Sequence, residues 1–141
     1  MVDNVLRFLF YDVEVLESVL SNRDLWEQPL LDLWAVPHFL SGVLIAAAFI
    51  LLARSLVSGF FFAGFIAVAW ELFEHATGIS TVEATSNIIA DVIVLLVGFA
   101  VLVPFRSLLS DERGQWLVGS VSVAHVATTL LGWLSYQQYA V

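Results

Sequence analysis

The sequence predicts an all-α, polytopic membrane protein: a bundle of four transmembrane helices preceded by an amphipathic N-terminal helix. Hydrophobic residues make up 60% of the 141 residues, whereas soluble domains contain about 45–50%. Charged residues make up only 13%, which is about half the usual share. The apolar residues are gathered into long runs, and the mean hydropathy of the chain is +0.93. We expect one membrane domain over residues 1–141.

The composition excludes several classes of chemistry. The chain has no cysteine, so it has no disulfides, thiolate metal ligands or cysteine nucleophiles. Thirteen acidic residues against five arginines and no lysine give a formal net charge of −8. Nucleic acid is therefore not expected as a partner. An acidic protein whose positive charge comes only from arginine is also what we expect of a halophilic organism, in which acidic surfaces stay hydrated.

The N-terminal segment 3–21 has the pattern of an amphipathic helix. Asp3, Arg7, Tyr11, Glu14 and Ser18 form a polar stripe along one face of this helix, and the apolar residues form the rest of its surface. Asp12 and Glu17 raise the number of acids to four, which is too many for a lone spanning helix. We therefore predict a helix that lies at the membrane interface. A spanning helix is the alternative.

Four apolar runs follow, and we predict spanning helices over 37–53, 59–75, 85–103 and 116–139. Pro37 suits the first turn of the first helix, because its missing N–H would have no partner there. Thr77-Gly78 ends the second run, and Pro104 stops the third. The fourth run begins with Trp116 and ends with Trp133, Tyr136 and Tyr139, as is typical of residues that anchor a helix at the membrane surface.

The arginines predict the orientation in the cell membrane. Arg54 lies in the first connection, and Arg106 and Arg113 lie in the third, which we predict as a loop up to Gly114. In an alternation of four helices both connections fall on one side. By the positive-inside rule this side is cytoplasmic. The second connection then faces outward.

The same alternation predicts an outward-facing polar pocket. It brings the start of the first spanning helix, the end of the second and the start of the third to one side, with His38, Glu71, Glu74, His75, Glu83, Asn87 and Asp91. Residues spaced by three or four share one face of a helix, so the second and third helices each carry a polar stripe. An ionised carboxylate within a span costs about 2.5–3.5 kcal/mol on insertion scales. These stripes must therefore face protein, water or a cation.

A divalent metal ion is the simplest reason for several acids in one apolar setting. Carboxylate with imidazole suits zinc, manganese or iron, whereas carboxylates with amide and backbone oxygens suit calcium or magnesium. A second metal is not expected, because the Glu-x-x-Glu-His motif occurs once and di-iron bundles use two such motifs. Glu71 and Asp91 are the strongest candidates, since they lie one to two turns inside their helices. Glu74, His75 and Glu83 stand at helix ends, where solvation is the alternative.

His125 and several small residues have other interpretations. His125 lies midway along the fourth run, where a hydrogen bond to Ser122, Thr129 or the backbone would explain it. A place on a path through the bundle is the alternative. The small residues that we expect to serve close helix packing are Gly59, Gly64, Ala67 and Gly98.

Residues 37–103 resemble the VanZ-like family of small integral membrane proteins. The residues that carry the resemblance are His38, Phe39, Gly42, the acidic pair that ends the second span, Asn87, Asp91 and Gly98. The resemblance implies a multi-helix membrane protein from a family in which some members are tied to glycopeptide-antibiotic resistance. It implies no particular reaction.

Three functions remain open on the sequence alone. The pocket could bind a cation and act on a lipid-linked or small polar substrate, with Glu71 and Asp91 as ligands or general bases. Alternatively, the acids and His125 could handle protons or cations in a transporter or channel subunit, which would need an oligomer. The chain could also be an accessory subunit that binds another membrane protein. Whether the chain is an enzyme stays open.

Overall fold

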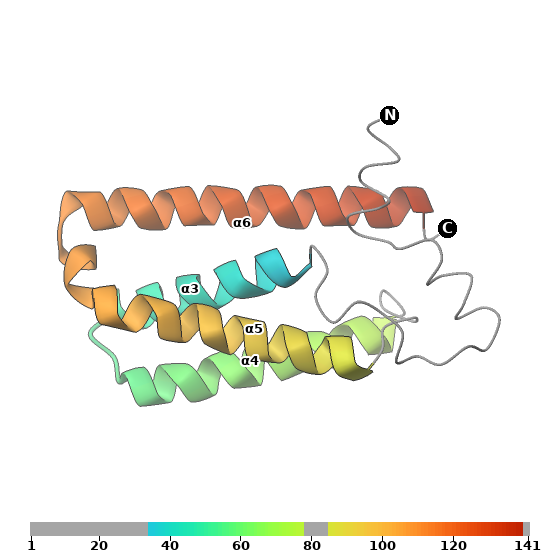
Figure 1. The fold of residues 1–141 in the computed structure, drawn as a ribbon, viewed down its shortest axis with the longest axis horizontal. Helices are drawn as coiled ribbons and strands as arrows, with labels where there is room; N and C mark the ends of the chain where they lie inside the picture. Colours follow the sequence, from blue (N-terminus) through green and yellow to red (C-terminus); the bar gives the residue numbers. More distant parts are fainter. Residues whose placement is uncertain (1–33, 78–84, 140–141) are drawn as a thin grey trace.

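The structure, a computed structural model, describes residues 34–77 and 85–139, and these residues are helical with no strand among them (Figure 1). The elements are α3 (Ala35–Leu51), α4 (Leu56–Thr77), α5 (Thr85–Leu102), the 3-10 helix η1 (Val103–Ser110) and α6 (Glu112–Tyr139). The all-α prediction is confirmed for this part of the chain. The predicted N-terminal helix 3–21 lies outside the described residues.

Three stretches of the bundle are long and apolar enough to cross a membrane: Leu56–Thr77, Asn87–Leu109 and Glu112–Leu134. The 22 residues of α4 extend over about 33 Å, which matches a hydrocarbon core of about 30 Å. Helix α3 is also apolar but has only 17 residues, or about 26 Å. These lengths are consistent with a membrane protein.

The connection between the third and fourth predicted helices is not a loop, and this part of the prediction was wrong. Pro104 ends α5, but η1 follows at once with the proline in its first turn, where a missing N–H is tolerated. Helix α6 then begins at Glu112, four residues earlier than predicted. Asp111 caps the N-terminus of α6, because its Oδ1 accepts a hydrogen bond of 2.9 Å from the Gly114 N–H.

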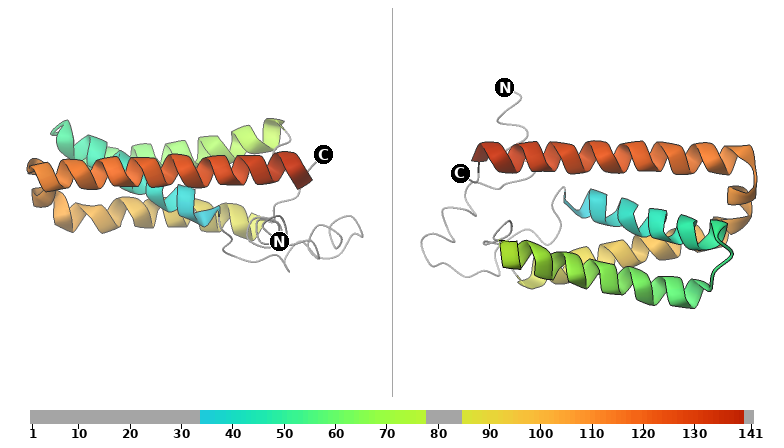
Figure 2. Two further views of the ribbon diagram at one scale, coloured as in Figure 1. Left: turned by 90° about the horizontal axis from the view of Figure 1, so that it is seen from above. Right: turned by 180° about the vertical axis from the view of Figure 1, so that it is seen from behind.

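Helix α3 lies at the centre of the arrangement, between α6 on one side and α4 and α5 on the other (Figures 1 and 2). Consecutive helices run in opposite directions, so α3 and α5 are parallel (Figure 1). The buried core is made of small and apolar side chains, chiefly Ala46 and Ala47 of α3, Ala63 and Ala67 of α4, and Leu95 and Phe99 of α5. Helix α6 packs mainly against α3 and η1.

Two glycines bring the backbones of α3 and α5 into direct contact. A Cβ atom on Gly42 would overlap the carbonyl oxygen of Leu95, and one on Gly98 would overlap the carbonyl oxygen of Phe39. Lipid gives helices no hydrophobic reason to associate, so close packing of this kind holds membrane helices together. The packing role predicted for Gly98 is confirmed. Gly64 plays no such role, because a Cβ there would meet only Leu96 at 3.8 Å.

We predict that Gly42→Ala and Gly98→Ala each destabilise the protein by about 1–3 kcal/mol, the usual range for forcing extra atoms into a packed interior. Thermal unfolding in detergent measures the loss. The control is Gly119→Ala in α6, since a Cβ atom there would meet nothing within 4 Å. This control should be neutral or slightly stabilising, because alanine favours helix over glycine. Equal effects of all three substitutions would contradict the close contact.

Candidate metal centre

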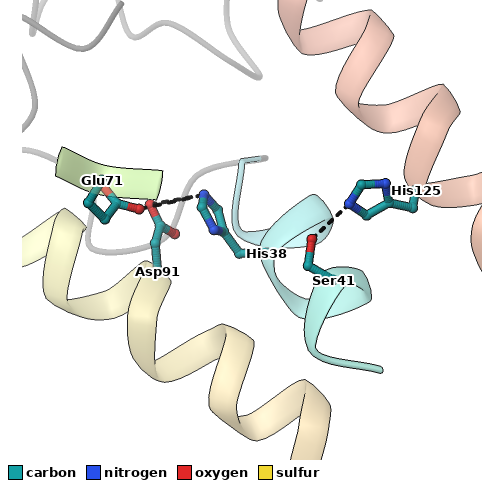
Figure 3. Close-up of polar contacts among 5 residues, drawn as sticks. All are labelled: His38, Ser41, Glu71, Asp91 and His125. Carbon is teal, nitrogen blue, oxygen red and sulfur yellow. Dashed lines mark hydrogen bonds and ion pairs between the residues drawn. The ribbon is translucent and has the colours of Figure 1, made fainter. Parts of the chain in front are cut away.

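Three predicted site residues from three different helices come together in the structure. His38 of α3 faces Glu71 of α4 and Asp91 of α5 (Figure 3). Its Nε2 atom lies 3.9 Å from Glu71 Oε1 and 3.9 Å from Asp91 Oδ2. One ligand atom from each residue lies within 4.8 Å of the others. This group could hold a metal ion.

The local sequence explains how each helix presents its ligand. His38 follows Pro37 in the first turn of α3, and Asp91 lies in the second turn of α5. On α4 the buried residues Gly59, Ala63, Ala67 and Glu71 recur every fourth position, so they form one face of the helix. The small residues let this face approach its neighbours closely. Glu71 therefore ends a packed face and projects into the bundle.

The cluster is shielded from its surroundings by the protein itself. The exposed fraction is 1% for Asp91, 6% for Glu71 and 9% for His38. The 3.9 Å separations between His38 and each carboxylate are longer than a hydrogen bond, so the imidazole faces both carboxylates at ion-pair distance. Tetrahedral coordination with bonds of about 2.1 Å separates ligand atoms by about 3.4 Å. Small side-chain rotations would bring the three atoms to that spacing.

Asn87 lies beside the cluster, one turn before Asp91 on α5. It is only 3% exposed, and its Oδ1 atom has no hydrogen-bond partner among the described residues. A buried amide oxygen without a partner costs about 1–3 kcal/mol. Such an atom is a ready acceptor for a water molecule or a cation near Asp91.

The other predicted site residues take different places. Glu74 is buried on the inner face of α4 with Glu71, so it is not a solvated residue at the helix end, and it is not a member of the group of three. His75 is exposed on the same helix and also lies outside this group. Glu83 lies outside the described residues.

His125 of α6 contacts α3 rather than its own helix. Its Nε2 atom lies 2.8 Å from Ser41 Oγ, whereas Ser122, one of the predicted partners, donates to the carbonyl oxygen of Val118 at 2.9 Å. Figure 3 shows that His38 and Ser41 leave α3 on different sides, His38 towards the carboxylates and Ser41 towards His125. The sequence did not lead us to expect the contact between Ser41 and His125. The feature that could have indicated it is a polar residue three positions after His38 in an otherwise apolar helix.

We predict that Ser41 and His125 stabilise the bundle cooperatively. A double-mutant cycle with Ser41→Ala and His125→Leu should give a coupling energy of about 0.6 kcal/mol, the average for hydrogen bonds between membrane helices. Unfolding in detergent measures each free energy. The control cycle pairs Ser41→Ala with Thr128→Ala, because the Thr128 hydroxyl bonds to its own helix at Ala124 O. Additive losses in the first cycle would show that the contact contributes nothing.

Comparisons with known proteins give no relative from which a function could be transferred. No family model matches the chain, and no curated protein or solved structure matches it. The resemblance to the VanZ-like family therefore stays a prediction.

Proposed function

We propose that the chain is a membrane protein of four spans that binds one divalent transition-metal ion between α3, α4 and α5, with His38, Glu71 and Asp91 as ligands. The observation that carries the proposal is the convergence of one imidazole and two carboxylates from three helices within 4.8 Å. All three side chains are buried. Ligands that are far apart in the sequence meet at one buried point.

Electrostatics supports a cation at this point. Burying a charge is costly unless it is paired or coordinates a metal. Glu71 and Asp91 both face His38 at 3.9 Å, so two carboxylates gather at one buried point beside a single imidazole. A divalent ion offsets both negative charges and accepts a neutral imidazole as its third ligand. The buried oxygen of Asn87 one turn away is suited to bind a water molecule of that ion.

The ligand set indicates which metal is favoured. Imidazole suits zinc and iron, whereas carboxylate, carbonyl and water oxygens suit calcium, magnesium and manganese. One imidazole with two carboxylates therefore fits zinc, iron or manganese. Three protein ligands leave at least one coordination position open, as catalytic metal sites do and closed structural sites do not. A metal in such a site polarises a bound oxygen or activates water. We therefore propose that the site acts on a lipid-linked or small polar substrate that reaches this end of the bundle.

The metal proposal predicts about one zinc or manganese ion per chain, measured by elemental analysis and calorimetric titration of the full chain in detergent. His38→Gln, Glu71→Gln and Asp91→Asn should each weaken binding by more than 100-fold, because loss of an outer-shell partner alone costs about 10- to 100-fold. Asn87→Leu should fall within that smaller range.

The matched control is His75→Gln, which removes an exposed imidazole one turn from Glu71 and outside the group of three. It should bind metal as the wild-type chain does. If the wild-type chain binds neither ion, or if the three ligand variants bind as well as the control, the proposed site is wrong.

The proposal also places the cluster at the outer surface, with the end that carries Arg54 and Arg106 in the cytoplasm. Because the chain has no cysteine, single cysteines report the sidedness directly. A membrane-impermeant maleimide should label Ala76→Cys in intact cells and Ser55→Cys only after permeabilisation. The unmodified chain is the control and should stay unlabelled. The reverse pattern would place the metal cluster on the cytoplasmic side.

A further inference from the structure

An apolar groove lies at the opposite end of the bundle from the metal cluster. It has a volume of about 380 Å³ and is lined by residues at the start of α4, the end of α5 and the start of η1, including Leu56, Phe60, Phe99, Ala100, Val103 and Pro104. This volume falls within the range of about 300–1,000 Å³ that is typical of small-molecule sites. The lining residues carry only apolar side chains, so the groove fits a hydrocarbon chain.

The groove is shallow and open, and its floor is formed by the bundle itself. The rings of Phe60 and Phe99 form part of it and pack edge to face, with centroids 5.8 Å apart. Its residues lie in the first turns of α4, the last turn of α5 and the start of η1, and Figure 2 shows these segments at the same end of the bundle. In a membrane these ends lie in one leaflet and close to its headgroups.

Two arginines lie close in the sequence to residues that line the groove. Arg54 lies two residues before Leu56, and Arg106 lies two residues after Pro104. Both side chains are exposed, and neither guanidinium makes a hydrogen bond or an ion pair within the described part of the chain. The acidic residue Asp111 lies nearby in the sequence, but its carboxylate caps α6 by accepting a hydrogen bond from the Gly114 N–H. Two of the five positive charges of an acidic chain are thus placed beside an apolar groove.

We propose that this groove and the two arginines form a binding site for one anionic phospholipid. Its acyl chain lies along the exposed lining residues Val57, Phe60 and Ala100, and its phosphate binds Arg54 and Arg106. Guanidinium groups bind phosphate oxygens through paired hydrogen bonds, and long arginine side chains extend from an apolar surface to the headgroups. An apolar helix or a second copy of the chain would fill the groove without using the two charges. The site does not depend on the metal cluster.

Native mass spectrometry of the full chain with phosphatidylglycerol or phosphatidylcholine tests this site. The wild-type chain should retain one phosphatidylglycerol with a preference on the order of 30-fold, the effect of two arginines near a membrane surface. Arg54→Gln/Arg106→Gln should lose the preference. The matched control Arg113→Gln, which removes an exposed arginine of α6, should keep it. Inorganic phosphate should not displace the lipid, because it lacks the chain that fills the groove.

The apolar half of the site is tested by filling the groove. Ala100→Phe should lower retention of phosphatidylglycerol, whereas Ala124→Phe on the exposed part of α6 should not. Asp91→Asn should leave lipid retention unchanged, which separates this proposal from the metal site. Equal retention of the two lipids by the wild-type chain, or an unchanged preference in the double arginine variant, would overturn the site. If Ala100→Phe retains phosphatidylglycerol as well as the wild-type chain does, the acyl chain does not lie in this groove.

Discussion

The direct backbone contact between α3 and α5 is the constraint on which the rest of the bundle depends. Gly42 lies one turn after His38 on α3, and Leu95, whose carbonyl oxygen faces Gly42, lies one turn after Asp91 on α5. The two helices are parallel (Figure 1), so a contact at one turn sets the separation at the turn before. The glycines therefore position the imidazole of His38 next to the carboxylate of Asp91.

Helix α4 adds Glu71, the third residue of the cluster, by the same physical means. Its inner face carries Gly59, Ala63 and Ala67 before it reaches Glu71. Small side chains allow a close approach, and in lipid this approach is what makes helices associate. The packing of α4 against its neighbours thus fixes the position of the Glu71 carboxylate.

Helix α6 is joined to the bundle differently. The Trp34 ring lies against Gly132, where a Cβ atom would overlap it, and Ser41 contacts His125. Most of the remaining surface of α6 is exposed. The helix therefore contributes no residue to the cluster of three, and lipid or a neighbouring protein would cover its outer face. His125, midway along α6, joins the helix to α3 through its hydrogen bond with Ser41.

The sequence by itself determined the helical fold class, four apolar helices to within a few residues, and a short list of polar residues that included His38, Glu71 and Asp91. These follow from local properties, namely hydrophobic runs, prolines and the cost of charge in an apolar helix. Only the tertiary structure decided which candidates meet. Glu74 and His75 follow Glu71 by three and four positions, which is the spacing of neighbours on one helix face. Neither, however, belongs to the group formed by His38, Glu71 and Asp91. His125 pairs with Ser41 instead of its own helix, and η1 replaces a loop. Such choices depend on the rotation and separation of neighbouring helices, which the glycine contacts set and which the pattern within a single helix does not contain.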